Sequence, residues 1–317
     1  MRNHNTKKKT RYKLKNWPEY NRSLIKRGDI TLWFSEDIAN SWYYDGPKTR
    51  GAQKVYSDLA IETALTIRSI LSLRLRNLQG FMESLVKIMK LRITIPDYTT
   101  ICRRQCGFKI ALRRITSSKE PLHVILDSTG LKVFGEGEWK VRRHGYTKHR
   151  MWNKLHIAID AATGEIIAQA LTTNKVSDAD AGVDLLKEIE EEISDLGGDG
   201  GYDQFKIYEE CDKRDINPLI SPQKNARIRS GGGNKSPWRA RDEIIKAINK
   251  NGRDEWKTSS GYSLRSLIET TMFRYKAIFG DRPLAYDIKN QKLETTLKCG
   301  ILNVFTKLGR PDSYAVV

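Results

Sequence analysis

The sequence predicts an α/β fold, in which a mixed sheet flanked by helices follows a mainly α-helical N-terminal region. Three observations support this prediction. From Ser57 to about Lys90, apolar residues recur at helical spacing. After Pro121, short extended runs rich in β-branched residues alternate with helical segments. The 317 residues also suffice for two units with buried cores, so we expect one domain over residues 1–120 and a second over residues 121–317.

Three helices are expected in the first unit. Helical spacing of apolar residues marks residues 57–72, with Ser57 as the N-cap, and residues 79–90. Pro96 suits the first turn of a third helix, whose exposed side would present Arg103 and Arg104. A basic third helix resembles the DNA-reading helix of a helix-turn-helix unit. A three-helix packing unit without DNA contact fits the pattern equally well.

The second unit alternates between extended and helical segments. Its strands are expected at residues 122–134, 138–143, 154–160, 165–173 and 216–222. Its helices are expected at residues 178–194, 204–214 and 261–279, with a loop and a short charged helix within residues 223–255. Strands followed by alternating strands and helices indicate a mixed sheet covered by helices.

The positive charge lies almost entirely in the first unit. The chain has 56 Lys and Arg against 38 Asp and Glu, a formal net charge of +18. Residues 1–120 hold 25 of the basic and 10 of the acidic side chains, whereas residues 121–317 hold 31 and 28. Such a basic region indicates a polyanionic partner, most commonly nucleic acid. For residues 1–15 alone, a solubilising tail explains the charge equally well.

The sequence has no apolar run of about 18 residues and no apolar segment behind its basic N-terminus. We therefore expect a cytoplasmic protein without a membrane partner. Its four cysteines are too few and too scattered for a disulfide framework, which agrees with a reducing compartment.

Two aspartates interrupt segments whose other residues are typical of buried structure. Asp127 follows the apolar run VIL and precedes Ser128, and Asp199 lies in the glycine-rich segment LGGDGGYD. Burying an unpaired carboxylate costs several kcal/mol, which a metal ion or a hydrogen-bond network must offset. Taken singly, each aspartate is typical of a turn or cap residue, because Asp is common in both places.

The last predicted helix of the second unit carries four polar residues at offsets of 0, 3, 7 and 14: Tyr262, Arg265, Glu269 and Lys276. At about 100° per residue, these fall within a sector of about 60°. Apolar residues cluster on the opposite side, including Leu264, Leu267, Ile268, Tyr275 and Ile278. The spacing alone is also that of an ordinary solvated face.

The pattern Tyr-x2-Arg-x3-Glu-x6-Lys resembles the signature around the catalytic glutamate of bacterial insertion-sequence transposases of the DDE class. The stretches LDSTGLKVFGEGEWKVRRHG, WNKLHIAIDAATGEI, GDGGYD and SPQKNAR are similar to segments of the insertion-sequence-five family. The front stretch NWPEYNRSLIKRGDITLWFS also resembles that family. The two aspartates and the glutamate come in the family's order, about 70 residues apart.

This resemblance implies a ribonuclease H-like fold with Asp127, Asp199 and Glu269 as catalytic residues. They would bind two Mg²⁺ ions, or Mn²⁺, because hard oxygen ligands suit these cations. Arg265 and Lys276 would contact phosphates, and Tyr262 would stack on a displaced base. A basic and aromatic stretch around Trp152 is interpreted as a further DNA contact or, equally well, a solvated strand edge; it holds Lys148, Arg150 and Lys154.

The implied function is transposition. The first unit would bind the terminal inverted repeats of an insertion sequence, and the second would hydrolyse one strand and join the freed 3′-OH to target DNA. Handling two ends together implies a homodimer or larger assembly on double-stranded DNA, at the bacterial nucleoid. Two alternatives stay open: a metal-dependent nuclease of the same fold without strand transfer, and a non-catalytic DNA-binding regulator.

Overall fold

A computed structural model describes residues 11–48, 50–51, 53–115, 120–133, 152–228 and 237–316. Its centre is a five-stranded sheet in the order β4-β3-β2-β5-β6. The strands are β2 (Leu122–Lys132), β3 (Trp152–Asp160), β4 (Ile166–Thr173), β5 (Ile193–Gly198) and β6 (Asn217–Ile220). β2, β3 and β4 are antiparallel neighbours, whereas β5 runs parallel to β2, and β6 parallel to β5. The expectation of a mixed sheet is confirmed.

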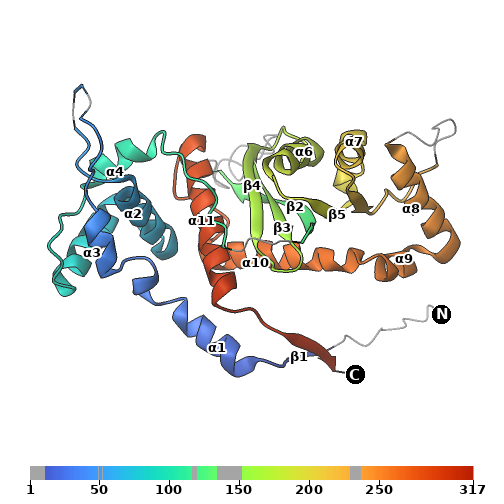
Figure 1. Ribbon diagram of the computed structural model, residues 1–317, viewed down its shortest axis with the longest axis horizontal. Helices are drawn as coiled ribbons and strands as arrows, with labels where there is room; N and C mark the ends of the chain where they lie inside the picture. Colours follow the sequence, from blue (N-terminus) through green and yellow to red (C-terminus); the bar gives the residue numbers. More distant parts are fainter. Residues whose placement is uncertain are drawn as a thin grey trace, which may run out of the picture.

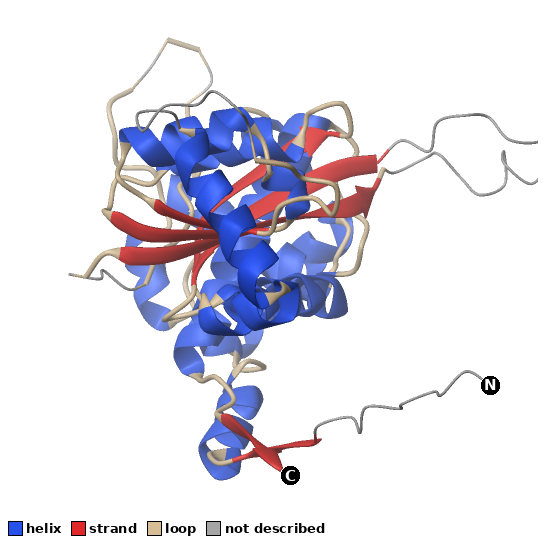
Figure 2. Cartoon of the chain, turned by 90° about the vertical axis from the view of Figure 1, so that its right-hand side faces the viewer, coloured by secondary structure: helices blue, strands red, loops and turns tan. Residues whose placement is uncertain are grey.

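Helices cover both faces of this sheet (Figures 1 and 2). One face carries α6 (Asp178–Glu188) and α7 (Phe205–Lys213), and the other carries α10 (Ser266–Phe279) and α11 (Ile288–Leu308). The side chains of alternate β2 residues pack on opposite faces of the sheet, because successive side chains of a strand point in opposite directions. Leu126 packs in the cluster with α6 and α7, and Ile125 in the cluster with α10 and α11.

The front helices are α2 (Asp58–Leu71), α3 (Leu75–Ile88) and α4 (Tyr98–Gln105), which pack on one another. Ser57 caps α2 as expected, since its hydroxyl accepts a hydrogen bond from the Ala60 amide. The expected start of α4 is wrong by two residues. Asp97 is the N-cap and accepts hydrogen bonds from the amides of Thr99 and Thr100, so Pro96 precedes the cap.

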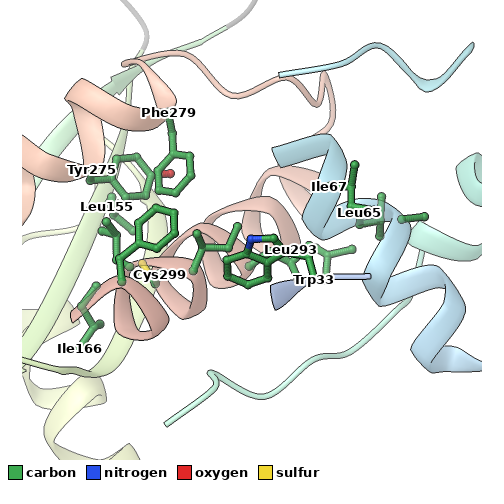
Figure 3. Close-up of a cluster of buried hydrophobic side chains, with 14 of the residues drawn as sticks. Trp33, Leu65, Ile67, Leu155, Ile166, Tyr275, Phe279, Leu293 and Cys299 are labelled. Carbon is green, nitrogen blue, oxygen red and sulfur yellow. The ribbon is translucent and has the colours of Figure 1, made fainter. Parts of the chain in front are cut away.

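α11 lies between the front helices and the sheet (Figure 1). It contacts α2 on one side and β4 on the other, so one hydrophobic cluster runs through all three. Figure 3 shows this continuity, from Leu65 of α2 past Leu293 and Cys299 of α11 to Leu155 and Ile166 of the sheet. The buried core therefore crosses residue 120.

The two ends of the described chain pair with each other beside this body. β1 (Arg11–Leu14) and β7 (Ser313–Val316) form an antiparallel two-stranded sheet. α1 (Trp17–Lys26) follows β1 and contacts α11, and the short 3-10 turns η1 (Ile30–Leu32) and η2 (Glu36–Ser41) lead on to α2. No helix among the described residues is both long enough and apolar enough to span a bilayer.

Three expectations for the second unit need correction. The helix that begins at Asp178 ends at Glu188, because Ile189 is extended and Ile193 pairs with Leu122 of β2. Among the described residues between 223 and 259 there are two helices, α8 (Trp238–Asn251) and α9 (Arg253–Ser259). The helix expected at 261–279 starts as a 3-10 turn, η4 (Tyr262–Arg265), before α10. The strand expected at 138–143 lies outside the described residues.

Candidate active site

The sheet places Asp127 on β2 and Asp199 directly after the end of β5, the neighbouring parallel strand. Ile125 of β2 is in register with Gly197 of β5, and each aspartate lies two residues further along its own strand direction. Asp127 is in the middle of β2, whereas Asp199 follows the end of β5 and caps the turn η3 (Gly200–Tyr202). The register therefore brings together two carboxylates that are far apart in the sequence.

α10 brings Glu269 to the same place through Arg265. The Arg265 guanidinium pairs with the Glu269 carboxylate one turn away, and its Nη1 lies 3.8 Å from Asp127 Oδ2. The side chains of Asp127, Arg265 and Glu269 are 19%, 25% and 54% exposed, so the group lies at the surface with its aspartate partly covered. Arg265 thus occupies the gap between the two carboxylates.

The charges of this group act on one another. Burial raises the pKa of Asp127, and the nearby charges of Asp199 and Glu269 raise it further. The Ser128 amide, which donates a hydrogen bond to Asp127 Oδ1, and the Arg265 guanidinium oppose this rise. Negatively charged carboxylates that lie close together repel one another, and the Arg265 guanidinium supplies a cation that offsets this repulsion.

The donor set suits a hard divalent cation, since all three acids offer carboxylate oxygens. Their present arrangement is not a closed metal cage. Among the residues that the structure describes, no three His, Cys, Asp or Glu side chains converge closely enough to hold an ion. Two local contacts account for this: Arg265 holds Glu269, and Asp199 Oδ1 accepts the Gly201 amide. Enclosing a cation therefore requires Arg265 to leave the gap.

The remaining residues of the helical face lie along η4 and α10. The Tyr262 ring packs on Trp256, with centroids 5.3 Å apart, and Lys276 is partly exposed seven residues beyond Glu269. The predicted apolar face of this segment is only partly buried, because Ile268 is fully buried whereas Leu264 is 40% exposed. The expected single amphipathic helix is therefore divided at the change from 3-10 to α geometry.

The other predicted DNA contacts have different surroundings. Arg103 is exposed on α4, but Arg104 pairs with Asp58 and donates to the Tyr56 carbonyl, so its side chain is only 18% exposed. The expectation that α4 presents Arg104 outward is thus wrong. Lys154 is 19% exposed and donates to Asp178 Oδ1 and the Val176 carbonyl, so it does not lie on a solvated strand edge. Lys148 and Arg150 lie outside the described residues.

Sequence reasoning missed Asp178, the first residue of α6. Its Oδ1 accepts hydrogen bonds from the Ser128 hydroxyl at 2.8 Å and from Lys154 Nζ at 3.2 Å. Ser128 directly follows Asp127 on β2, and Asp178 Oδ2 lies near the Asp199 loop, 3.6 Å from the position that a Cβ on residue 201 would occupy. The signal available in the sequence was weak, because an acid after Ser177 is an ordinary start for a helix.

Solved structures with chains similar to this one include the following two. The first is a piggyBac transposase in a synaptic complex with hairpin DNA, at 10% identity and a TM-score of 0.40, over 89% of this chain and 75% of that one. The second is a chain of a simian T-cell lymphotropic virus intasome in complex with PP2A regulatory subunit B56 gamma, at 13% identity and a TM-score of 0.23, over 59% and 66%.

Two family models described as a transposase DDE domain match the sequence, one over residues 25–136 and one over residues 118–304. The second covers more than half of the chain and includes Asp127, Asp199 and Glu269. With the mixed five-stranded sheet, this match confirms the predicted ribonuclease H-like fold. The chain belongs to the family of DDE transposases.

Proposed function

We propose that this transposase binds the terminal inverted repeats of an insertion sequence, cleaves DNA strands by metal-dependent hydrolysis and joins the 3′-OH ends to target DNA by transesterification. One observation carries the proposal: Asp127 and Glu269 flank a single cationic group, and the strand register puts Asp199 beside Asp127. Family membership supports transposition as the reaction that these acids would serve.

Asp127, Asp199 and Glu269 would hold two Mg²⁺ or Mn²⁺ ions. Such ions activate water or a 3′-OH and neutralise charge on the transferring phosphate. The charges of both other acids act on Asp127, which makes it the natural shared ligand. Its pKa is raised by burial, so it has more to gain from a bound cation than an exposed carboxylate.

The basic groups around these acids would position the DNA. When Arg265 leaves the gap, its guanidinium is free to pair with a phosphate, for which its planar donors are suited. Lys276 lies further along α10 and would contact the backbone. Tyr262, whose ring already packs on an aromatic neighbour, would stack on a displaced base.

The N-terminal region, residues 1–120, would recognise the ends. Its charge excess supplies phosphate affinity, and Arg103 on the exposed side of α4 is the first candidate for contact. Arg104 would instead hold α4 against α2 through Asp58. Lys148 and Arg150 are further candidates from sequence. We also propose a homodimer or larger assembly on DNA, acting at the bacterial nucleoid, because two ends must be joined together.

The test is Glu269→Gln, which keeps the size of the side chain and removes its charge. We expect end-DNA binding to persist, measured by fluorescence anisotropy, while strand cleavage with Mg²⁺ disappears. Glu243→Gln is the matched control, because Glu243 also pairs with an arginine one turn away, Arg239 on α8. Normal cleavage by Glu269→Gln would refute the assignment of this acid.

Two further assays separate the alternatives. A precleaved end and a target plasmid detect strand transfer, which a plain nuclease of the same fold would not perform. Asp127→Asn tests the non-catalytic regulator, since a regulator would keep full function in this variant and without divalent metal. We expect joined product from the unmodified protein and none from Asp127→Asn.

A further inference from the structure

Asp178 lies at the start of α6, on the side of the sheet opposite α10. Its Oδ1 is held by two donors from neighbouring strands, the Ser128 hydroxyl of β2 and Lys154 Nζ of β3. The His156 ring lies close by, with Nδ1 3.7 Å from the same oxygen. These contacts fix the orientation of the carboxylate and use only one of its two oxygens.

The second oxygen faces the loop that carries Asp199. Asp178 Oδ2 lies 3.6 Å from the position that a Cβ on residue 201 would occupy, and Asp199 Oδ1 lies 2.9 Å from the same position. Gly201 therefore separates the two carboxylates with no side chain between them. No hydrogen bond from the described residues to Asp178 Oδ2 competes for this oxygen.

A buried hydroxyl provides an independent observation. Tyr202 is 2% exposed, and its Oη has no hydrogen-bond partner among the described residues. Burial raises the pKa of Tyr202, and the charges of Asp127, Asp178 and Asp199 raise it further. An unsatisfied buried hydroxyl costs about 1–3 kcal/mol, which a bound ion with its water shell would offset.

We propose that Asp178 is a fourth carboxylate of the divalent-cation site, with Oδ2 directed at a cation or its water and Oδ1 held by Ser128 and Lys154. The proposal rests on the function proposed above. Orienting contacts of this kind are what metal-ligating carboxylates require, and the two donors leave the second oxygen available. Asp178 would add negative charge on the α6 side of the sheet, complementing Glu269 on the α10 side.

The experiment measures Mn²⁺ binding to the full chain without DNA, by isothermal titration calorimetry and by electron paramagnetic resonance of free Mn²⁺. Asp178→Asn keeps the oxygen that accepts from Ser128 and Lys154 and removes the charge. We expect it to weaken Mn²⁺ binding about tenfold. Asp180→Asn is the matched control on the same first turn, because Asp180 is 54% exposed and pairs with Lys206, and it should bind as the unmodified protein does.

A second variant covers the case in which Asp178→Asn fails to fold. Asp178→Glu keeps the charge and both oxygens but shifts them by one methylene, so a ligand should lose Mn²⁺ affinity. A carboxylate that only anchors Ser128 and Lys154 would retain unmodified affinity in this variant. That result, or unmodified affinity in a folded Asp178→Asn, would overturn the proposal.

Asp127→Asn distinguishes failure of this inference from failure of the proposed function. If Asp127→Asn loses Mn²⁺ binding while folded Asp178 variants retain it, the catalytic site stands and Asp178 is not part of it. If Asp127→Asn binds Mn²⁺ normally, the cation site is not at these acids. The proposed function and the role of Asp178 then both fail.

Discussion

Arg265→Gln should make Mn²⁺ binding tighter and DNA cleavage slower. The guanidinium now occupies the gap between Asp127 and Glu269, so a cation entering this gap must displace it. The substitution keeps a polar side chain at this position while removing the competing charge. It also removes the group that we assign to a DNA phosphate, so the two measurements should move in opposite directions.

The size of the effect follows from distance and exposure. Charges about 4 Å apart attract by about 4 kcal/mol at an effective dielectric constant of 20, and desolvation and water cancel most of this gain. Net values for exposed pairs are about 0.2–1 kcal/mol, and Arg265 makes two contacts, one of them to a partly covered aspartate. If the variant spares an entering cation about 1.4 kcal/mol of lost Arg265 contacts, Mn²⁺ binding becomes tenfold tighter.

The assay is Mn²⁺ titration of the DNA-free protein, followed by cleavage of end DNA at saturating Mn²⁺. Arg239→Gln is the control, because Arg239 forms the same type of pair with Glu243 on the exposed surface of α8. It should change neither measurement. Unchanged or weaker Mn²⁺ binding by Arg265→Gln would show that Arg265 does not compete for the cation position.

The remaining predictions concern stability. Lys298→Met should lower the free energy of unfolding by about 3–5 kcal/mol in urea denaturation, because it leaves Glu294, only 4% exposed, without its ion pair; a loss below about 1 kcal/mol would contradict this. Asp97→Ala should cost about 1 kcal/mol through loss of the α4 cap. Hydrogen bonds from Thr99 and Thr100 lower the pKa of Asp97, so this difference should exist above the unfolded pKa near 3.8 and fade as the pH falls through the lower folded value. Asp127→Asn should raise the melting temperature of the metal-free protein at neutral pH. Burial raises the pKa of Asp127, so the charged Asp127 carboxylate destabilises the folded state as the pH rises above the pKa that this group has in the unfolded chain. The rise in melting temperature should vanish at a pH below the unfolded-state pKa of Asp127. A lower melting temperature of Asp127→Asn at neutral pH would disprove the prediction.

Asp127 could be found from the sequence because a carboxylate directly after an apolar run conflicts with burial. The pairing of β2 with β5 could not be found in this way, because the helical spacing of apolar residues continues through Ile189 and Ile193. Ile193 instead joins the sheet beside Leu122, and this distant partner decides the local structure. Tertiary pairing therefore overrides the local period and moves the expected end of the helix.

Long-range partners also explain the misjudged side chains. Periodicity correctly puts Arg104 on the polar side of α4, yet it cannot reveal that Asp58 stands opposite and draws the guanidinium inward. Lys154 is a basic residue of an extended strand, and only the fold brings Asp178 to it. In each case the residue type and its local element were predictable, whereas its partner was not.

The position of α11 determines how the separate roles of residues 1–120 in end recognition and of the acids in cleavage can be tested. Removing residues 1–120 would uncover the side of α11 that packs on α2, including Leu297 and Ile301, which are now buried. The truncated chain would lose part of a core that also supports α10 and hence Glu269. Loss of cleavage after truncation would then report damage to the acids as well as loss of DNA recognition. Arg103→Gln on the exposed side of α4 leaves this core intact, so a change in its selectivity for end DNA would report on recognition itself.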